Sequence, residues 1–360
     1  MLNVCFFIGN LNNSGGTERI TSVIANELSK LNYNVSILTL HSGEKPFFPL
    51  CKEIKTSQIN KKKYKTLFQL PSTIFKLRRY LRKNDIDIII DVDTMLSIYT
   101  IPALFMISNI KHISWEHFNY NVTLGKKIRI PIRNIAAKFS DIIITLTERD
   151  KSLWIKHTKG KNIIAIPNPI TLQGNIPRLN INKKKCILAV GRLTHQKGFD
   201  ILIHSWKIVN QQYPDWCLKI IGSGEDEYNL TNLINLLELD NSVEIAPTTY
   251  QIEAEYYLSS YLVSSSRYEG FGLVILEAQS CGLPVISFDC DAGPSEIIRN
   301  NISGWLCECE NINELALKII NAINIFDKNP EFYKELEKNS IINSKRFTVE
   351  NILPLWTKIL

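Results

Sequence analysis

The chain repeats one local pattern, a short apolar strand followed by a glycine-containing loop and a helix, and this repetition restricts the folds open to it. The first copy runs from the strand 3–8 through a loop that ends in Gly15-Gly16. The second copy runs from the strand 186–190 through the loop 191–198. A strand, a helix and a further strand in this order form a parallel unit, so each copy predicts a parallel sheet covered by helices.

Further short apolar segments predict the other strands. They are 34–40, 86–90, 110–114, 141–145 and 163–166 in the first half, and 218–221, 243–246, 261–265, 284–288 and 305–307 in the second. A chain of 360 residues is long enough for two domains. Polar residues after Pro167-Asn168-Pro169 predict a hinge between them. We therefore expect an α/β protein with two Rossmann-like domains, over 1–170 and 171–345, that face each other across a cleft.

Glu269 and Glu277 bracket a Gly-Phe-Gly turn at the predicted start of a helix. Glycines allow backbone N–H groups to approach a ligand closely, and a helix N-terminus favours anionic oxygens. Glu277 is expected two helical turns beyond Glu269. Carboxylates accept hydrogen bonds from hydroxyl pairs, so the two side chains suit a sugar and a ribose. The alternative is a solvated glutamate at each end of an amphipathic helix, which the glycine turn and the neighbouring motifs disfavour.

Arg192 and Lys197 lie in a loop that closes with Gly198 before a helix. A guanidinium and an ammonium beside a helix N-terminus suit a diphosphate. They would neutralise the charge that develops on a departing nucleoside diphosphate without a metal ion. The alternative is two surface bases beside a turn.

The turn at Gly15-Gly16 is suited to a sugar or phosphate held against bare backbone. It lacks both the complete glycine pattern of dinucleotide-binding sites and the lysine of a phosphate-binding loop, so neither NAD nor ATP is favoured. Glu18 lies in the first helical turn, where its charge complements the helix dipole, and a ligand role remains equally open.

Two further candidates follow strands of the first half. His117, in the segment 115–119, is suited to a sugar hydroxyl or to stabilisation of developing positive charge, and a structural role is equally open. Asp91 and Asp93 have the spacing of carboxylates that hold a divalent metal against a nucleotide diphosphate. Because the basic pair already serves the diphosphate, we interpret these two residues as a polar strand end and expect no metal ion.

The net charge of +7 is unevenly distributed. Residues 1–170 contain 25 Lys and Arg against 12 Asp and Glu, a net charge of +13, and residues 171–360 have a net charge of −6. A concentrated basic block with interleaved apolar residues predicts contact with an anionic membrane. It comprises Lys61, Lys62, Lys63, Lys65, Lys76, Arg78, Arg79, Arg82 and Lys83, with Phe68, Leu70, Ile74, Phe75, Leu77, Tyr80 and Leu81 between them. A solvated helix face is the alternative, and no motif supports nucleic acid.

The remaining composition favours a cytoplasmic protein. No run of eighteen apolar residues is present, and the apolar segment 1–9 lacks the basic start and cleavage site of a signal peptide. The eight cysteines show no metal-binding spacing, so we expect reduced thiols. We therefore expect peripheral association with the inner face of the cytoplasmic membrane.

Together these segments resemble glycosyltransferase family 4, whose members have the GT-B fold. The resemblance spans nearly the whole chain and rests on residues 15–19, 167–169, 191–198, 267–277 and 291–298. It implies retaining transfer of a sugar from a nucleotide sugar, with no metal ion or other cofactor. It also implies that a C-terminal helix over 346–360 crosses back to the first domain, where Trp356 anchors it.

The resemblance also implies roles for the residues of the Gly-Phe-Gly segment. Glu269 would contact the donor sugar. The backbone N–H groups of Phe271, Gly272 and Leu273 would hold sugar hydroxyls and phosphate. Glu277 would bind the ribose hydroxyls.

The other matching residues would complete the donor site. Arg192 and Lys197 would hold the diphosphate, and Gly16 would form a wall beside the phosphate and the acceptor. His117 would lie near the sugar. The departing phosphate would take the proton of the acceptor, so that no protein base is required.

The segments 15–19 and 115–119 look similar to bacterial enzymes that build O-antigen, capsule or exopolysaccharide units on an undecaprenyl diphosphate carrier. This likeness implies transfer of a hexose or N-acetylhexosamine to a lipid-linked or growing saccharide bound by the first domain. UDP-galactose, UDP-N-acetylgalactosamine and UDP-glucose are the expected donors, in that order. Two alternatives remain open, a nucleotide-sugar epimerase of GT-B fold and a non-catalytic carbohydrate-binding or scaffold subunit.

Overall fold

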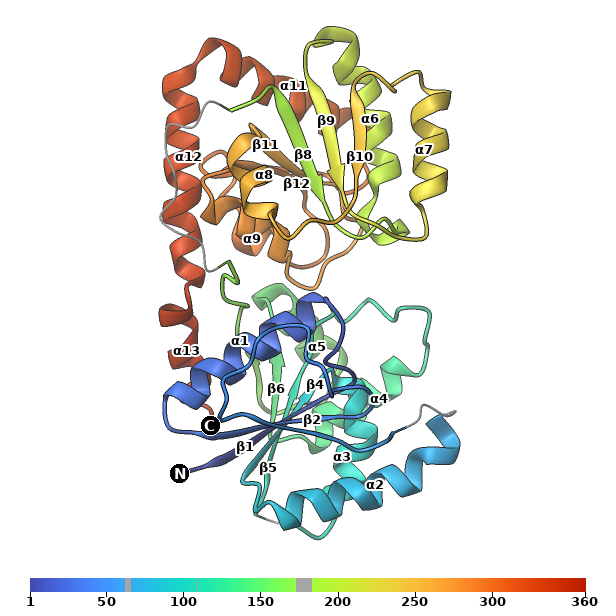
Figure 1. Cartoon of the computed structure of the whole chain (residues 1–360), viewed down its shortest axis with the longest axis vertical. Helices are drawn as coiled ribbons and strands as arrows, with labels where there is room; N and C mark the ends of the chain where they lie inside the picture. Colours follow the sequence, from blue (N-terminus) through green and yellow to red (C-terminus); the bar gives the residue numbers. More distant parts are fainter. Residues whose placement is uncertain (62–65, 108, 173–182) are drawn as a thin grey trace. The chain divides into compact units, whose positions relative to one another are not determined.

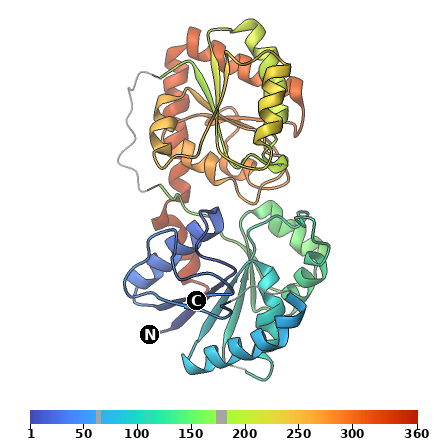
Figure 2. The same cartoon turned by 45° about the vertical axis from the view of Figure 1, so that its right-hand side comes forward.

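The computed structural model describes residues 1–61, 66–107, 109–172 and 183–360 and divides the chain into two compact units. Unit 1 comprises Met1–Thr171 and Val349–Leu360, and unit 2 comprises Leu172–Thr348; the expected boundaries were residues 170 and 345. Each unit is a parallel sheet with helices on both faces (Figures 1 and 2). This confirms the expected pair of Rossmann-like α/β domains.

The sheet of unit 1 has seven parallel strands in the order β3-β2-β1-β4-β5-β6-β7. Its strands are β1 (Asn3–Ile8), β2 (Asn34–Thr39), β3 (Lys55–Gln58), β4 (Ile88–Val92), β5 (Lys111–Trp115), β6 (Ile142–Thr145) and β7 (Ile163–Ala165). The strands expected in this half are confirmed, with ends that shift by up to two residues. The edge strand β3 was not expected, because its residues are polar and partly exposed and carry no apolar signal.

Alternate residues of β1 point to opposite faces of the sheet, and this alternation separates two groups of helices. The helices of unit 1 are α1 (Gly16–Lys30), α2 (Thr66–Lys83), η1 (Thr94–Leu96), α3 (Ser97–Leu104), α4 (Arg129–Phe139), α5 (Glu148–His157) and α13 (Val349–Thr357). Phe7 packs in a core with Leu77 of α2 and Tyr99 of α3. Phe6 points to the other face and contacts Trp356 of α13.

Helix α13 belongs to unit 1 although it follows all of unit 2 in the chain. Trp356 is fully buried, and its ring centroid lies 4.6 Å from that of Trp115 and 6.4 Å from that of Phe6. Lys111 Nζ donates a 2.7 Å hydrogen bond to the carbonyl of Ile359. These contacts confirm the expected return of the C-terminal helix and the anchoring role of Trp356.

Helix α2 carries the described part of the basic block. Lys76, Arg79, Arg82 and Lys83 are exposed on it, whereas Lys62, Lys63 and Lys65 lie outside the described residues. The interleaved leucines 77 and 81 are fully buried in the core of unit 1. The described part of the apolar stripe of α2 therefore packs against the sheet, whereas the charged side and Phe75 face outward.

The sheet of unit 2 has six parallel strands in the order β10-β9-β8-β11-β12-β13. They are β8 (Cys186–Val190), β9 (Cys217–Ile221), β10 (Val243–Ala246), β11 (Tyr261–Ser264), β12 (Val285–Phe288) and β13 (Gly304–Cys307), each within one residue of its expected bounds. The helices are η2 (His195–Lys197), α6 (Phe199–Gln212), α7 (Glu227–Leu236), α8 (Ile252–Leu258), α9 (Leu273–Ser280), α10 (Pro294–Ile297), α11 (Ile312–Lys328), α12 (Pro330–Ser344) and η3 (Lys345–Phe347).

Within the described ranges, no helix combines the length and the apolar character that a bilayer-spanning segment needs.

Candidate functional site

Two loops of unit 2 meet at the edge of its sheet where the strands end. The loop 191–198 follows β8 and the loop 265–272 follows β11, and these two strands are neighbours. Ligands of open α/β sheets bind beyond the carboxyl ends of the strands. Here the structure brings together two residues that are 72 positions apart, with Lys197 Nζ 2.6 Å from Glu269 Oε1.

Several contacts fix these two loops to one another. Arg267 forms a bidentate ion pair with Asp200, with nitrogen–oxygen distances of 2.9 and 2.6 Å. Ser265 Oγ donates a 2.9 Å hydrogen bond to the carbonyl of Lys197. Gly198 has φ 62°, and a Cβ there would collide with the carbonyl oxygen of Ser265. Only glycine allows this close approach of the two loops.

The ion pair between Lys197 and Glu269 is largely shielded from solvent, because the two side chains are 18% and 9% exposed. Ser266 Oγ donates a further 2.7 Å hydrogen bond to the same carboxylate oxygen. Two donors on one oxygen fix the orientation of the carboxylate. Since a carboxylate has about four acceptor positions, Glu269 can also accept hydrogen bonds from ligand hydroxyls.

The Gly-Phe-Gly turn leads directly into α9. Gly272 is the N-cap residue, with φ 97°, and has no side chain that could bond to the first N–H groups of the helix. The N–H of Ile275 bonds to the carbonyl of Gly272, and the first two N–H groups, those of Leu273 and Val274, form a site for anionic or hydroxyl oxygens. Phe271 is buried, with its ring 5.7 Å from that of Phe347, and this contact anchors the turn.

Glu277 lies one turn into α9, because the helix begins only at Leu273. The expectation that it lies two helical turns beyond Glu269 was therefore wrong. Its side chain is buried, and Tyr256 of α8 donates its hydroxyl to Oε2 over 3.2 Å.

Arg192 shares the loop of Lys197 but is exposed. The Cβ of any residue in place of Gly191 would lie 3.0 Å from Lys197 Cε, so the lysine side chain runs directly past this glycine. The structure therefore places Lys197 against Glu269 and leaves Arg192 at the surface of the same loop.

The other predicted residues belong to unit 1, where the loops after β1, β4 and β5 follow one another along the sheet edge. Gly15 is the N-cap residue of α1, which begins at the exposed Gly16. Asn13 Nδ2 donates a 3.3 Å hydrogen bond to Glu18 Oε1, and a Cβ on Gly15 would collide with the other carboxylate oxygen. Glu18 thus lies against the start of its own helix, where its negative charge interacts favourably with the helix dipole.

His117 lies two residues beyond the end of β5 and is buried. Its ring centroid lies 4.3 Å from that of Trp115. Burial lowers the pKa of His117 to about 4, so the ring is neutral at neutral pH. Its buried Nε2 has no hydrogen-bond partner among the described residues. A neutral imidazole with an unpartnered nitrogen fits a hydrogen bond to a ligand hydroxyl rather than a cationic role.

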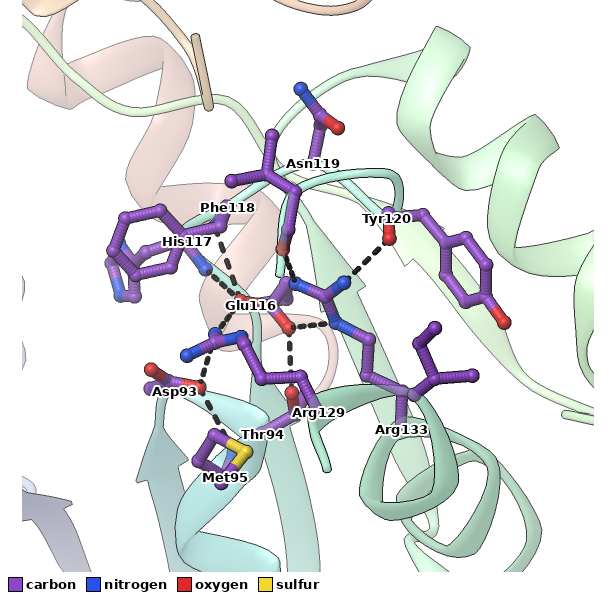
Figure 3. A network of polar contacts seen from close by, with 12 residues as sticks. Asp93, Thr94, Met95, Glu116, His117, Phe118, Asn119, Tyr120, Arg129 and Arg133 are labelled. Carbon is purple, nitrogen blue, oxygen red and sulfur yellow. Dashed lines mark hydrogen bonds and ion pairs between the residues drawn. The ribbon is translucent and has the colours of Figure 1, made fainter. Parts of the chain in front are cut away.

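Glu116 is the centre of a buried polar network that fixes this loop (Figure 3). Its Oε2 accepts hydrogen bonds from Arg133 Nε at 3.0 Å and Thr94 Oγ1 at 2.6 Å. Its Oε1 accepts from Arg129 Nη2 at 3.2 Å and from the backbone N–H of Phe118 at 3.1 Å. Burial alone would raise the pKa of Glu116, but the charges of the two arginines lower it below its ordinary value.

Asp93 follows β4 and therefore lies between the glycine loop of unit 1 and the loop of His117. Its φ of 93° is a strained value for a residue with a side chain. Oδ1 accepts from the N–H of Met95 at 2.9 Å and from Arg129 Nη2 at 2.8 Å. Burial, together with the charge of Glu116, raises the pKa of Asp93 to about 6.

Asp91 and Asp93 do not form a common ligand pair. Asp91 is fully buried and accepts hydrogen bonds from Ser97 Oγ (2.9 Å) and Thr100 Oγ1 (2.6 Å), and it lies 2.7 Å from His112 Nε2. Within the ranges that the structure describes, no three His, Cys, Asp or Glu side chains are arranged to bind a metal ion.

Sequence reasoning missed the partners that hold the predicted residues. In unit 2 these are Ser266 and Arg267, which lie in the predicted loop but were given no role of their own. In unit 1 they are Glu116 and the pair Arg129 and Arg133. The spacing of four residues between the two arginines places them on one face of a helix, and this was the available signal.

Two family descriptions match adjacent parts of the chain. The description "Glycosyltransferase Family 4" matches residues 14–173, and "Glycosyl transferases group 1" matches residues 175–341.

Curated relatives match the chain over its full length. An uncharacterized glycosyltransferase of Haemophilus influenzae is 37% identical, and the amylovoran biosynthesis glycosyltransferase AmsD of Erwinia amylovora is 31% identical, with 100% of both chains covered in each case. An α-1,4-N-acetyl-D-galactosaminyltransferase of Campylobacter jejuni is 28% identical and covers 100% of this chain and 98% of its own.

Solved structures of low sequence identity share the fold. TarM of Staphylococcus aureus superposes with a TM-score of 0.83 at 17% identity, covering 100% of this chain and 98% of its own. HepE of Anabaena in complex with UDP superposes with a TM-score of 0.81 at 20% identity, covering 99% of both chains. These similarities confirm the expected GT-B fold class. Because relatives of 37% and 31% identity match it from end to end, the chain belongs to the family 4 and group 1 glycosyltransferases and is a glycosyltransferase.

Proposed function

We propose that the protein transfers a hexose or N-acetylhexosamine from a UDP-linked donor to a lipid-linked or growing saccharide, with retention of configuration at the sugar. The observation that carries this proposal is the shielded contact between Lys197 and Glu269, which lies beside a glycine turn and the uncapped start of α9. A cation, a carboxylate and free backbone N–H groups at one edge match the charges and hydroxyls of a nucleotide sugar.

In this proposal Glu269 accepts hydrogen bonds from hydroxyls of the donor sugar, while the turn around Phe271, Gly272 and Leu273 holds sugar and phosphate oxygens. Glu277, buried in α9, accepts hydrogen bonds from the ribose hydroxyls. The orientation of Glu269 is already set by Lys197 and Ser266, so little ordering is needed when the donor binds.

The positive charges of Arg192 and Lys197 would stabilise the diphosphate as the bond to the sugar breaks. The acceptor attacks on the face from which the phosphate departs, and a phosphate oxygen takes its proton. This route needs neither a metal ion nor a protein base. The exposed position of Arg192 leaves its guanidinium available to the diphosphate.

The acceptor would bind to unit 1, beside the loop of Gly15-Gly16 and the unpartnered nitrogen of His117. Relatives support the class of acceptor. The name of the Campylobacter jejuni enzyme gives a saccharide on diphosphate-linked undecaprenol as its acceptor, and AmsD acts in amylovoran biosynthesis. The complex of HepE with UDP supports a UDP-linked donor. Because a polyprenyl carrier resides in a membrane, the proposal includes peripheral contact of the protein with an anionic inner leaflet. It includes no nucleic acid partner.

The test is release of UDP from a panel of UDP-sugars, with bacterial membrane extract as the source of acceptor. Glu269→Gln should abolish release, whereas Glu335→Gln, which changes an exposed glutamate of α12, should not. Release from one donor that depends on the extract would support transfer, and the anomeric configuration of the product tests retention. Conversion of the donor to a free isomer without acceptor would contradict transfer and favour an epimerase. Binding of donor without any turnover, whatever acceptor is supplied, would favour a scaffold.

A further inference from the structure

Unit 1 contains an open pocket of about 950 Å³ at the edge of the sheet where the strands begin. This edge is opposite to the one that carries His117, because β5 begins with Lys111 at the pocket and ends with Trp115, just before the loop of His117. A volume of this size is in the range of pockets that hold small ligands. The walls come from the end of α3, from residues 105, 107, 109 and 110 after it, from the start of β5, from the last residue of α4 and from Asp141.

The mouth of the pocket is apolar and faces outward. Phe105 and Phe139 line the pocket and are 72% and 56% exposed, and the adjacent Met106 is 85% exposed. We call these three residues the apolar rim. Ile135 precedes Phe139 by one turn of α4 and is 46% exposed, so it extends the apolar surface along the helix. Large apolar side chains that gather at the surface mark an interaction site.

Cations adjoin the apolar rim. Arg78 of α2 donates from Nη1 to the carbonyl of Phe105 at 2.6 Å, and Lys138 Nζ lies 5.1 Å from the ring centroid of Phe139. Arg82 is exposed one helical turn after Arg78. Among the described residues, the one carboxylate that lines the pocket is Asp141, and it accepts the backbone N–H of His112 in β5 at 2.7 Å. The patch is therefore net positive.

The charge of the whole unit has the same sign. Unit 1 contains 26 Lys and Arg against 13 Asp and Glu, a net charge of +13, whereas unit 2 has a net charge of −6. A positive field of this kind attracts an anionic surface, and each Lys or Arg near such a surface adds to the attraction.

One buried polar atom also lies at the pocket. His112 lines it and is buried, and its Nδ1 has no hydrogen-bond partner in the part of the chain that the structure describes. The other ring nitrogen, Nε2, lies 2.7 Å from Asp91 Oδ2, which fixes the orientation of the ring. The pocket thus combines apolar walls with a few polar side chains, Asn109, Lys111, His112 and Asp141, as an amphipathic ligand requires.

We infer that the apolar rim and its pocket bind an anionic phospholipid, with an aliphatic chain in the pocket and the headgroup phosphate beside Arg78, Arg82 and Lys138. This inference rests on the proposed function, in which the acceptor is carried by a membrane lipid. The sequence placed the membrane contact on the apolar stripe of α2, but the leucines of that stripe are buried in the core. The inference assigns the contact instead to the neighbouring surface of α3 and α4. Aromatic side chains beside cations are the combination favoured at bilayer interfaces.

The test is co-sedimentation of the full chain with vesicles, one set of phosphatidylcholine alone and one containing phosphatidylglycerol. We expect binding to the anionic vesicles and at least tenfold weaker binding of Phe105→Asp and Phe139→Asp, since each places a carboxylate at the contact. Leu236→Asp is the matched control, because it changes a leucine that is 78% exposed on α7 of unit 2. Phe105→Trp reports insertion directly through a blue shift of its fluorescence when anionic vesicles are added.

Three results would overturn the inference. One is absence of binding to anionic vesicles, and another is equal loss of binding in Phe105→Asp and Leu236→Asp. The third is that the rim variants abolish self-association of the chain without changing vesicle binding, which would assign the surface to a second copy. UDP release separates this inference from the proposed function. Vesicle binding that requires the rim, in a protein that releases no UDP from any donor, would retain the surface and refute the transfer reaction.

Discussion

Replacement of Lys197 by methionine removes the cation from Glu269 and keeps a side chain of similar length. At a nitrogen–oxygen distance of 2.6 Å and an effective dielectric constant of about 20, the two charges attract one another by about 6 kcal/mol. Desolvation of both groups offsets more than half of this attraction, since the side chains are only 18% and 9% exposed. We therefore expect a net coupling of about 2–3 kcal/mol between the two residues.

A double-mutant cycle measures this coupling. The free energy of opening is obtained from hydrogen exchange of peptides in β8 and β11, which reports on unit 2 alone, for Lys197→Met, Glu269→Gln and the double variant. The pair Lys185–Asp215 is the control, because its distance is 2.7 Å but its side chains are 43% and 59% exposed. Its coupling should be much smaller, since water screens an exposed pair.

The same variant links the pair to catalysis. If Lys197 stabilises the departing diphosphate, Lys197→Met should lower kcat by about 100-fold, the effect of removing one electrostatic contact to the transition state. Affinity for UDP should fall less. Two outcomes would refute the reasoning. One is that the effects of the two substitutions on stability add to within about 0.5 kcal/mol, and the other is that Lys197→Met turns over at the rate of the wild type.

Four other outcomes follow from the structure. Glu277→Gln should weaken UDP binding about tenfold in calorimetry, because it removes a charged acceptor for the ribose hydroxyls; unchanged affinity would exclude that role. Burial raises the pKa of Asp150 to about 7, so the native state loses stability as the pH rises from about 4 to 7. An uncharged residue at this position avoids that loss. The melting temperature of Asp150→Asn should therefore exceed that of the wild type by more at pH 8 than at pH 5. Gly198→Ala should destabilise unit 2 by more than about 1 kcal/mol in urea unfolding, because the added Cβ meets the Ser265 carbonyl. Gly125→Ala is the control, since Gly125 has a similar φ of 72° but open space around it. It measures the cost of the backbone conformation without the collision. A chelator such as EDTA should leave UDP release unchanged, and loss of release that Mg²⁺ or Mn²⁺ restores would contradict metal-free transfer.

The sequence was sufficient to locate the loops of the candidate site. Short apolar segments bounded by glycines marked the strand ends, and parallel strands place the loops that follow them at one edge. The contact between Lys197 and Glu269 could not be predicted in the same way. It depends on β8 and β11 being neighbours, although β9 and β10 lie between them in the chain. Local periodicity carries no information about the order of strands in a sheet.

The buried charges of unit 1 were beyond sequence reasoning for a different reason. Charged residues are usually exposed, so the sequence did not indicate that Glu116, Arg129 and Arg133 are buried together. The spacing of the two arginines places them on one helix face but does not show that this face turns inward. The converse error affected α2, whose leucines were interpreted as part of a membrane surface. In both cases the residue type was known but the face of the element was not, and only tertiary packing decides which face turns inward.

The return of α13 to unit 1 determines the order in which the protein can be completed during synthesis. The strands of unit 1 are made first, yet Phe6 and Trp115 lack their contact with Trp356 until that residue has emerged from the ribosome. All of unit 2 is translated before that point and can fold earlier as an independent unit. The domain whose strands are made first is therefore the last to be completed, and its aromatic core lacks one ring until α13 is made.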